Sequence, residues 1–93
     1  MIKSFKCKET EKIWDEEYSK KIPADIQKRS LKKLMMIEYA ECLTDLKNPP
    51  KNCLEALKGD RQGQYSIRIN DQWRVCFKWL DNHAFDVEIV DYH

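Results

Sequence analysis

Three side chains capable of proton transfer stand side by side at the end of this sequence: Asp91, Tyr92 and His93. Residues 85–90, which precede them, read Phe-Asp-Val-Glu-Ile-Val and are rich in strand formers. Because a chain end is usually poorly ordered unless an element ties it down, we expect this strand to hold the three residues at fixed positions. An acid, a phenol and an imidazole held in that way are suited to general acid–base chemistry.

The second half of the chain predicts the sheet that positions these residues. Residues 64–69 and 73–79 alternate between apolar and polar side chains, and turn formers occupy residues 70–72 and 81–83. We therefore expect an antiparallel meander that closes with a strand over residues 84–92. Its inward face is predicted to carry Tyr65, Ile67, Ile69, Trp73, Val75, Phe77, Trp79, Phe85, Val87 and Ile89.

The first half of the chain predicts two helices. Thr10 is suited to cap a helix over residues 11–18, and Pro23 suits the first turn of a longer helix over residues 24–41. Helices followed by strands predict a single α+β domain over residues 1–93, with two N-terminal helices packed on one face of a small, mainly antiparallel sheet. The apolar stripe predicted for the second helix comprises Ile26, Leu31, Leu34, Met35, Tyr39 and Cys42.

A basic cluster on the second helix is expected to face away from the core. It consists of Lys28, Arg29, Lys32 and Lys33. Such a cluster forms either a solvated helix face or a nucleic-acid contact. The solvated face is the more common of the two.

The sheet face opposite the helices is predicted to be uncovered and to gather cations. Cleavage of RNA by its own 2′-hydroxyl needs a base, cations that neutralise the pentavalent phosphorane, and an acid for the leaving 5′-oxygen. Arginine matches phosphate geometry with a two-pronged set of donors. If cationic side chains neutralise the phosphorane, the reaction needs no metal ion. We therefore expect neither a metal nor another cofactor. The alternation points Ser66, Arg68, Arg74, Cys76, Lys78, Glu88 and Tyr92 toward this face.

The distribution of charge allows two interpretations. The net charge is +1, yet positions 58–78 hold five cationic and two acidic residues, and the positions after 78 hold four acidic residues and no Lys or Arg. A local anion site explains this distribution. Salt bridges between neighbouring strands, such as a pair between Arg74 and Glu88, explain it as well.

Cysteine spacing and hydropathy narrow the class of protein. The four cysteines are scattered without a C-x-x-C pair, which predicts reduced and mostly buried thiols, although an even count is compatible with two disulfides. The spacing of Cys and His predicts no metal site. No apolar run approaches the ~20 residues of a membrane span, and the N-terminus lacks a secretory signal. We therefore expect a cytoplasmic protein that does not contact a membrane.

Three motifs occur in order along the second half: Leu-Lys-Gly-Asp-Arg at residues 57–61, the dipeptide Trp73-Arg74, and the terminal Asp-Tyr-His. Together with the opening Met-Ile-Lys-Ser-Phe-Lys, they resemble the HigB-type toxins of the RelE superfamily, which are bacterial toxin–antitoxin nucleases. The resemblance spans nearly the whole chain. It implies a ribosome-dependent endonuclease that cuts mRNA in the ribosomal A site, and a cognate HigA-type antitoxin with a helix-turn-helix fold.

The same resemblance implies roles for single residues. Lys58 and Arg74 would stabilise the phosphorane, Tyr92 and His93 would transfer and orient protons, and Asp91 would position its neighbours or the base being read. Looser contacts to the RNA backbone would come from Arg61, Arg68 and Lys78.

One position departs from the pattern of these toxins. Glu55 stands where HigB relatives carry a histidine three residues before the lysine of the motif. A carboxylate at this point is a candidate general base, but it also repels phosphate. Glu55 therefore keeps open a second interpretation, a catalytically inactive module of the same fold that binds an antitoxin-like partner. A nucleotide-binding domain is disfavoured because the chain has only two glycines and no glycine-rich phosphate loop.

Overall fold

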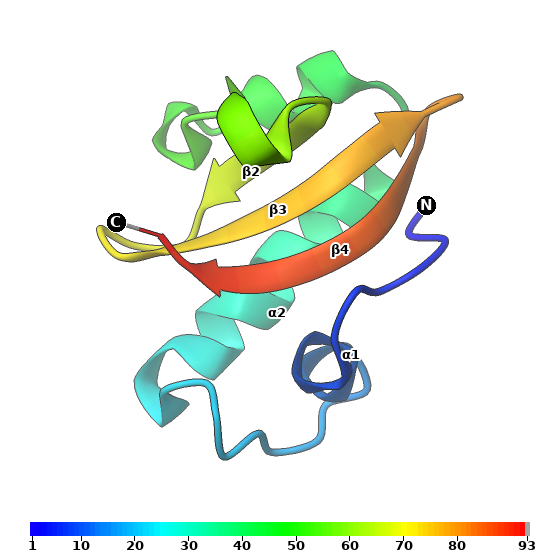
Figure 1. The fold of residues 1–93 in the computed structure, drawn as a ribbon. Helices are drawn as coiled ribbons and strands as arrows, with labels where there is room; N and C mark the ends of the chain where they lie inside the picture. Colours follow the sequence, from blue (N-terminus) through cyan, green and yellow to red (C-terminus); the bar gives the residue numbers. More distant parts are fainter. Residues whose placement is uncertain (93) are drawn as a thin grey trace.

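The computed structural model describes residues 1–92, and it has the α+β architecture that the sequence predicts (Figure 1). The helices are α1 (Lys8–Trp14) and α2 (Ala24–Tyr39), and an antiparallel sheet has the order β1-β2-β3-β4. Within residues 1–92, no helix has the length and apolarity needed to cross a membrane. The strands are β1 (Glu55–Ala56), β2 (Gln64–Arg68), β3 (Trp73–Leu80) and β4 (His83–Asp91), and the 3₁₀ helices are η1 (Leu43–Lys47), η2 (Pro50–Asn52) and η3 (Gly59–Arg61).

Helix α1 begins earlier than predicted because Cys7, not Thr10, is its N-cap. The Cys7 Sγ accepts a hydrogen bond from the Thr10 backbone N–H at 3.4 Å. Thr10 lies inside the helix and is fully buried, and its Oγ1 accepts a hydrogen bond from the backbone N–H of Ile89 at 2.9 Å. The helix ends at Trp14, so Tyr18 is not part of its apolar face and is 68% exposed.

The buried face of α2 differs from the predicted stripe. Met35 and Tyr39 are exposed, and Ile37, which the prediction omitted, is fully buried. Lys33 was expected to face solvent but is only 9% exposed, because its Nζ donates a hydrogen bond to the Asn52 Oδ1 at 2.6 Å. The buried face of α2 therefore includes one lysine that has a polar partner inside the fold.

The core lies between the sheet and both helices, which contact the same face (Figure 1). Val75, Phe77 and Val87 supply the sheet side, and Leu34 and Ile37 supply the α2 side; all five are fully buried. Burying side chains of this size stabilises the fold by about 1.5–3 kcal/mol each. The core therefore anchors β3 and β4, the strands that carry most of the candidate site.

The first residues of the chain run beside β4. Isolated parallel bridges join Ile2 to Ala84 and Phe5 to Val87. The Lys3 backbone N–H donates to the Ala84 carbonyl at 2.8 Å. The opening Met-Ile-Lys-Ser-Phe-Lys segment is thus joined to β4 by two isolated bridges and does not form a continuous strand.

A β-bulge in β4 reverses one predicted orientation. The pairing of β4 with β3 shifts by one position between Cys76 and Lys78. Asp86, with a left-handed φ of 52°, marks the bulge. Beyond this point the alternation is inverted, so Phe85 pairs with Lys78 and shares its outward face, and Ala84 is fully buried in the core instead.

The sheet face opposite the helices is not uncovered. Ser66 and Cys76 point toward it, yet both are 0% exposed. In Figure 1, the bright green turn of η3 lies in front of β2, whereas α2 lies behind the sheet. The Arg74 Nη1 also donates to the Cys53 carbonyl at 3.3 Å across this face. Residues 53–63 therefore supply a partial cover that the alternation of the strands could not reveal.

The four cysteines are free thiols. Cys76 is buried, but Cys42 and Cys53 are exposed and Cys7 is half-buried. The prediction that most of these thiols are buried is therefore wrong, because Cys42 and Cys53 lie in the irregular segment between α2 and β1, where little packs over them.

Candidate functional site

A row of four side chains crosses the whole sheet on the face opposite the helices. Glu55 pairs with Ser66, Ser66 with Cys76, and Cys76 with Glu88. Directly opposed residues project to the same face, with Cβ atoms about 4.5–5.5 Å apart. The row therefore has a carboxylate at each end and two small buried side chains between them. Burial raises the pKa of the Cys76 thiol, so this thiol is held in its neutral form.

Arg61 lies over one end of this row. Its Nη1 donates to the Glu88 Oε1 at 2.7 Å and to the Gln64 Oε1 at 3.2 Å. The hydrogen bond to Glu88 raises the pKa of Arg61, so the guanidinium stays charged. Among the residues described, Glu88 forms ion pairs with Arg61 and, at 3.8 Å, with Lys6, so the Arg74–Glu88 pair considered as an alternative is not the one that forms.

Arg74 lies over the middle of the same face. Its Nη1 donates to the Ser66 Oγ at 3.0 Å and to the Cys53 carbonyl at 3.3 Å. Its guanidinium carbon is 5.7 Å from the centre of the Tyr92 ring, which is a cation–π arrangement. These acceptors are neutral, so they hold the guanidinium in place without compensating its charge. A fixed cation of this kind is suited to bind an anion.

A second cation stands directly opposite Arg74. The β2–β3 register pairs Arg68 with Arg74, and like charges in opposed positions are destabilising. Arg68 forms an ion pair with Asp71 in the turn that follows β2. The Arg68 guanidinium is thereby drawn toward the turn, whereas that of Arg74 is drawn toward Ser66.

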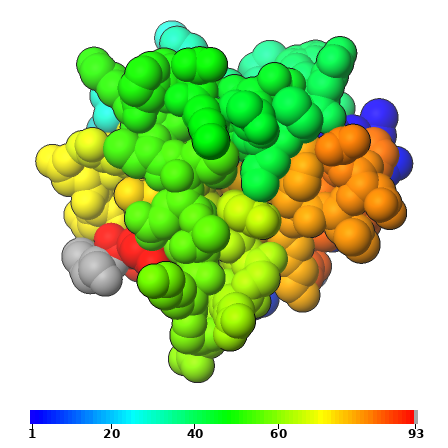
Figure 2. All heavy atoms as spheres, turned by 90° about the horizontal axis from the view of Figure 1, so that it is seen from above, coloured from blue at the N-terminus to red at the C-terminus, as the bar shows by residue number. Residues whose placement is uncertain are grey.

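The turn before β3 holds the chain end against the sheet. The Tyr92 backbone N–H donates to the Gln72 carbonyl at 2.7 Å, and the Gln72 Nε2 donates to both Asp91 carboxylate oxygens at 3.1 Å. Figure 2 shows the end of the chain, in red, between the yellow turn before β3 and the green segment that contains η3. The expected anchoring of Asp91 is confirmed by its pairing with Trp73, and His93 lies outside the described residues.

The two lysines of the predicted site have separate surroundings. Lys58 is exposed and precedes η3 as its N-cap residue. Lys78 forms an ion pair with Asp86 at 3.3 Å, beside the bulge in β4. The contacts of Arg74 therefore bring together Arg74, Tyr92 and Ser66, with Arg68 in the opposed position of β2.

Two contributors were missed from the sequence. The sequence places Gln72 only in a turn. In the structure its carbonyl accepts from the Tyr92 backbone N–H and its side chain donates to Asp91, so both hold the chain end. The Cys53 carbonyl, from the segment before β1, accepts from Arg74. A polar residue that directly precedes the Trp-Arg motif was the available signal for Gln72. A backbone acceptor leaves no signal in the sequence.

This arrangement combines a preorganised guanidinium, a phenol and carboxylates at the ends of a short row. In many enzymes, hydrogen-bond donors that are fixed in advance where charge develops in the transition state make the largest single contribution to the rate enhancement. A guanidinium that already has its orientation can bind a phosphate without a further ordering cost. The site is therefore chemically suited to bind and polarise a phosphodiester.

The fold is shared with chains of solved structures. It matches a chain of the heterotetrameric YoeB–YefM toxin–antitoxin complex from Staphylococcus aureus with a TM-score of 0.62, over 100% of this chain and 98% of that chain, at 22% identity. A second YoeB–YefM structure from the same organism gives a TM-score of 0.57 at 21% identity. This chain and the matched chains therefore share their overall fold.

Sequence comparison identifies the family. Residues 3–93 match the family described as RelE-like toxin of type II toxin–antitoxin system HigB. The chain is 36% identical over 87 residues to Toxin HigB-1 of Vibrio cholerae, covering 92% of each chain. It is 33% identical over 93 residues to Endoribonuclease HigB of Proteus vulgaris, covering 100% of each. The chain belongs to the HigB-like toxin family.

Proposed function

We propose that this chain is an endoribonuclease toxin that cuts mRNA in the A site of the ribosome and so arrests translation. Its similarity to Endoribonuclease HigB of Proteus vulgaris over the full length of both chains supports the nuclease activity. The single observation that carries the proposal is the position of Arg74, whose guanidinium is held by neutral acceptors beside the Tyr92 ring. Such a function would be exercised in the cytoplasm, where mRNA is translated.

The proposed reaction is attack by the 2′-hydroxyl of the substrate on the adjacent phosphorus. A base removes the 2′-hydroxyl proton, the new O–P bond forms, and the bond to the 5′-oxygen breaks as that oxygen receives a proton. Arg74 and Lys58 neutralise the phosphorane, and Tyr92 and His93 orient and transfer protons. Asp91 positions these neighbours or the base being read, and looser contacts to the RNA backbone come from Arg61, Arg68 and Lys78.

Dependence on the ribosome follows from the weakness of the candidate base. Glu55 is exposed on the two-residue strand β1. An exposed carboxylate is a poor acceptor for a hydroxyl proton, so much of the rate would have to come from alignment of the 2′-hydroxyl by the ribosome. We therefore expect little cleavage of free RNA. Rapid cleavage of purified RNA without ribosomes would contradict this part of the proposal.

The proposed partner is a HigA-like antitoxin with a helix-turn-helix fold. The RelE-like neighbours of this fold were solved in toxin–antitoxin complexes, which supports an antitoxin partner. A catalytically inactive module that binds the same partner is the alternative, and Glu55 at a position that is histidine in relatives is the observation that favours it. Both functions use the same fold, but only the toxin affects growth.

Growth assays separate these two functions. Induction of the chain in a bacterial host is expected to stop growth, and co-expression of a helix-turn-helix protein encoded beside it is expected to restore growth. An Arg74→Ala chain, produced at the same level, is the matched control and is expected to leave growth unchanged. Induction that leaves growth unchanged in several hosts would favour the inactive module.

A further inference from the structure

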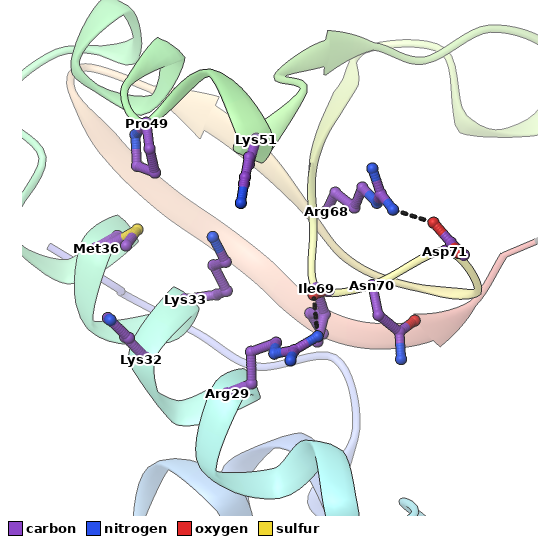
Figure 3. Close-up of a pocket in the computed structure, with 10 residues that line it drawn as sticks. All are labelled: Arg29, Lys32, Lys33, Met36, Pro49, Lys51, Arg68, Ile69, Asn70 and Asp71. Carbon is purple, nitrogen blue, oxygen red and sulfur yellow. Dashed lines mark hydrogen bonds and ion pairs between the residues drawn. The ribbon is translucent and has the colours of Figure 1, made fainter.

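A cationic cleft of about 570 Å³ lies between α2, η2 and the turn that follows β2 (Figure 3). Five of its ten lining residues are cationic, and Asp71 is the one carboxylate among them. Because Asp71 is already paired with Arg68, its charge does not offset the other cations. The cationic residues of the cleft are Arg29, Lys32, Lys33, Lys51 and Arg68.

Lys33 is built into the wall of this cleft. It is 9% exposed, and its Nζ donates at 2.6 Å to the Oδ1 of Asn52, a fully buried residue. Asn52 is itself fixed, because its Nδ2 donates to the carbonyls of Leu46 and Asn48 at 3.2 and 3.3 Å. An ammonium has three donors, and the amide oxygen of Asn52 accepts one of them without supplying charge. In Figure 3, Lys33 and Lys51 point toward one another across the cleft.

Holding these cations together is costly unless an anion joins them. Arg29, Lys32 and Lys33 are neighbours on α2, where like charges three or four residues apart repel. Burial lowers the pKa of Lys33, and the charges of Lys32 and Arg29 lower it further. An anion in the cleft would remove both the repulsion and part of the cost of burying an ammonium. Binding of an anion would therefore relieve electrostatic repulsion among the cations that line the cleft.

We propose that the cleft is a second phosphate-binding site, which holds the backbone of the RNA strand beyond the part that lies over Arg74. The link between the two sites is Arg68, which lines the cleft and stands opposite Arg74 in the β2–β3 pair. An RNA backbone carries one charge per nucleotide, which fits cations spread over three elements. This proposal rests on the proposed function, because that function identifies the bound strand as RNA. The experiment below distinguishes failure of the cleft proposal from failure of the proposed function.

Binding of a short labelled RNA to the purified full chain tests the proposal. The RNA carries 2′-O-methyl groups, so it cannot be cut, and fluorescence anisotropy reports its affinity. The cleft variant is Lys32→Ala with Lys51→Ala, and the control variant is Lys8→Ala with Lys20→Ala, which removes the same charge from exposed positions outside the cleft. Equal thermal midpoints for the three chains establish that all are folded.

The cleft variant is expected to bind the RNA at least about tenfold more weakly at low salt, with a salt slope smaller by about 1.4, or about 0.7 for each lost contact to a single strand. The control variant is expected to change the affinity by less than about twofold. Equal losses in both variants would overturn the proposal, because general attraction would explain them. Tighter binding of a polyglutamate peptide than of RNA would also overturn it.

Competition with ATP and with pyrophosphate distinguishes an RNA strand from a free nucleotide. ATP binding that is lost in the cleft variant, while RNA binding is retained, would overturn the assignment to RNA. Cleft-dependent RNA binding by a chain that never cuts mRNA in cells would uphold the cleft and refute the nuclease. If the native chain cuts mRNA in cells but the cleft variant and the control variant bind RNA equally well, the nuclease is upheld and the cleft is refuted.

Discussion

The guanidinium carbon of Arg74 lies 5.7 Å from the centre of the Tyr92 ring. This cation–π contact joins β3 to the residue that follows β4. The contact depends on the Tyr92 backbone, which is tied to the Gln72 carbonyl at 2.7 Å. Arg74 in turn is held by Ser66. One guanidinium thereby connects β2, β3 and the chain end into the arrangement that we propose binds phosphate.

Replacement of Arg74 tests whether this guanidinium acts in chemistry or only in packing. Arg74→Ala is expected to reduce toxin-dependent cleavage about 10²–10³-fold, as the loss of one charge-stabilising donor does in other enzymes. Its free energy of unfolding is expected to change by about 1 kcal/mol, because relief of the repulsion from Arg68 offsets the lost hydrogen bonds. Arg74→Lys is expected to remain impaired, since an ammonium lacks the planar fork. Loss of folding in Arg74→Ala would indicate a structural role instead.

Thr10 is predicted to be a strong local contributor to stability. Its fully buried Oγ1 accepts the backbone N–H of Ile89, so Thr10→Val would leave that donor unsatisfied. We expect a loss of about 1–3 kcal/mol in the free energy of unfolding, measured by urea denaturation. Thr10→Ser keeps the hydroxyl and is the matched control, expected to lose less. A Thr10→Val chain as stable as the native chain would contradict a contribution from this hydrogen bond.

Thiol labelling is expected to divide the cysteines into two classes. Cys42 and Cys53 are exposed and should react with a disulfide reagent in the folded protein. Cys76 is fully buried, and burial raises the pKa of its thiol, so little thiolate is available. It should react only when the chain unfolds, as counted by mass spectrometry of the labelled peptides. Rapid labelling of Cys76 in the native state would show that residues 53–63 open easily.

The pH dependence of stability is expected to carry a signature of Lys33. Burial lowers its pKa in the folded state, so between that value and the ~10.4 of an unfolded lysine the unfolded chain binds more protons. Stability contributed by Lys33 therefore rises with pH across this window. The free energy of unfolding of the native chain, minus that of Lys33→Met, should increase as pH is raised from neutrality toward this alkaline limit. A constant difference would contradict the lowered pKa.

Much of the fold followed from local patterns, because β2 and β3 alternate regularly and α2 begins at Ala24, directly after Pro23. The errors occur where a single local contact outweighs the pattern. Asp86 inserts a bulge that turns Phe85 outward, although nothing but its position distinguishes this aspartate from others in the sequence. Cys7 replaces Thr10 as the cap because the hydroxyl of Thr10 is used by β4.

The candidate site was predictable in its residue types but not in its pairings. The alternation of β3 placed Arg74 on the correct face, and the terminal triplet drew attention to Tyr92. The pairing of Glu88 with Arg61 depends on η3 folding over the sheet, which is a long-range contact without a sequence signal. The buried position of Lys33 depends likewise on Asn52, a partner from a separate element. The alternation of residues predicts which face of a strand a side chain occupies. The partner of that side chain, and the segment that packs over it, depend on long-range packing.

The most direct test of the central claim is to map mRNA 5′ ends in cells after induction of the native chain and of Arg74→Ala at equal levels. We predict new ends inside translated regions, in register with codons, for the native chain and none for the variant. Deletion of His93 in parallel tests the role proposed for the terminal imidazole. Identical profiles for the native chain and Arg74→Ala, with or without cuts, would contradict the account.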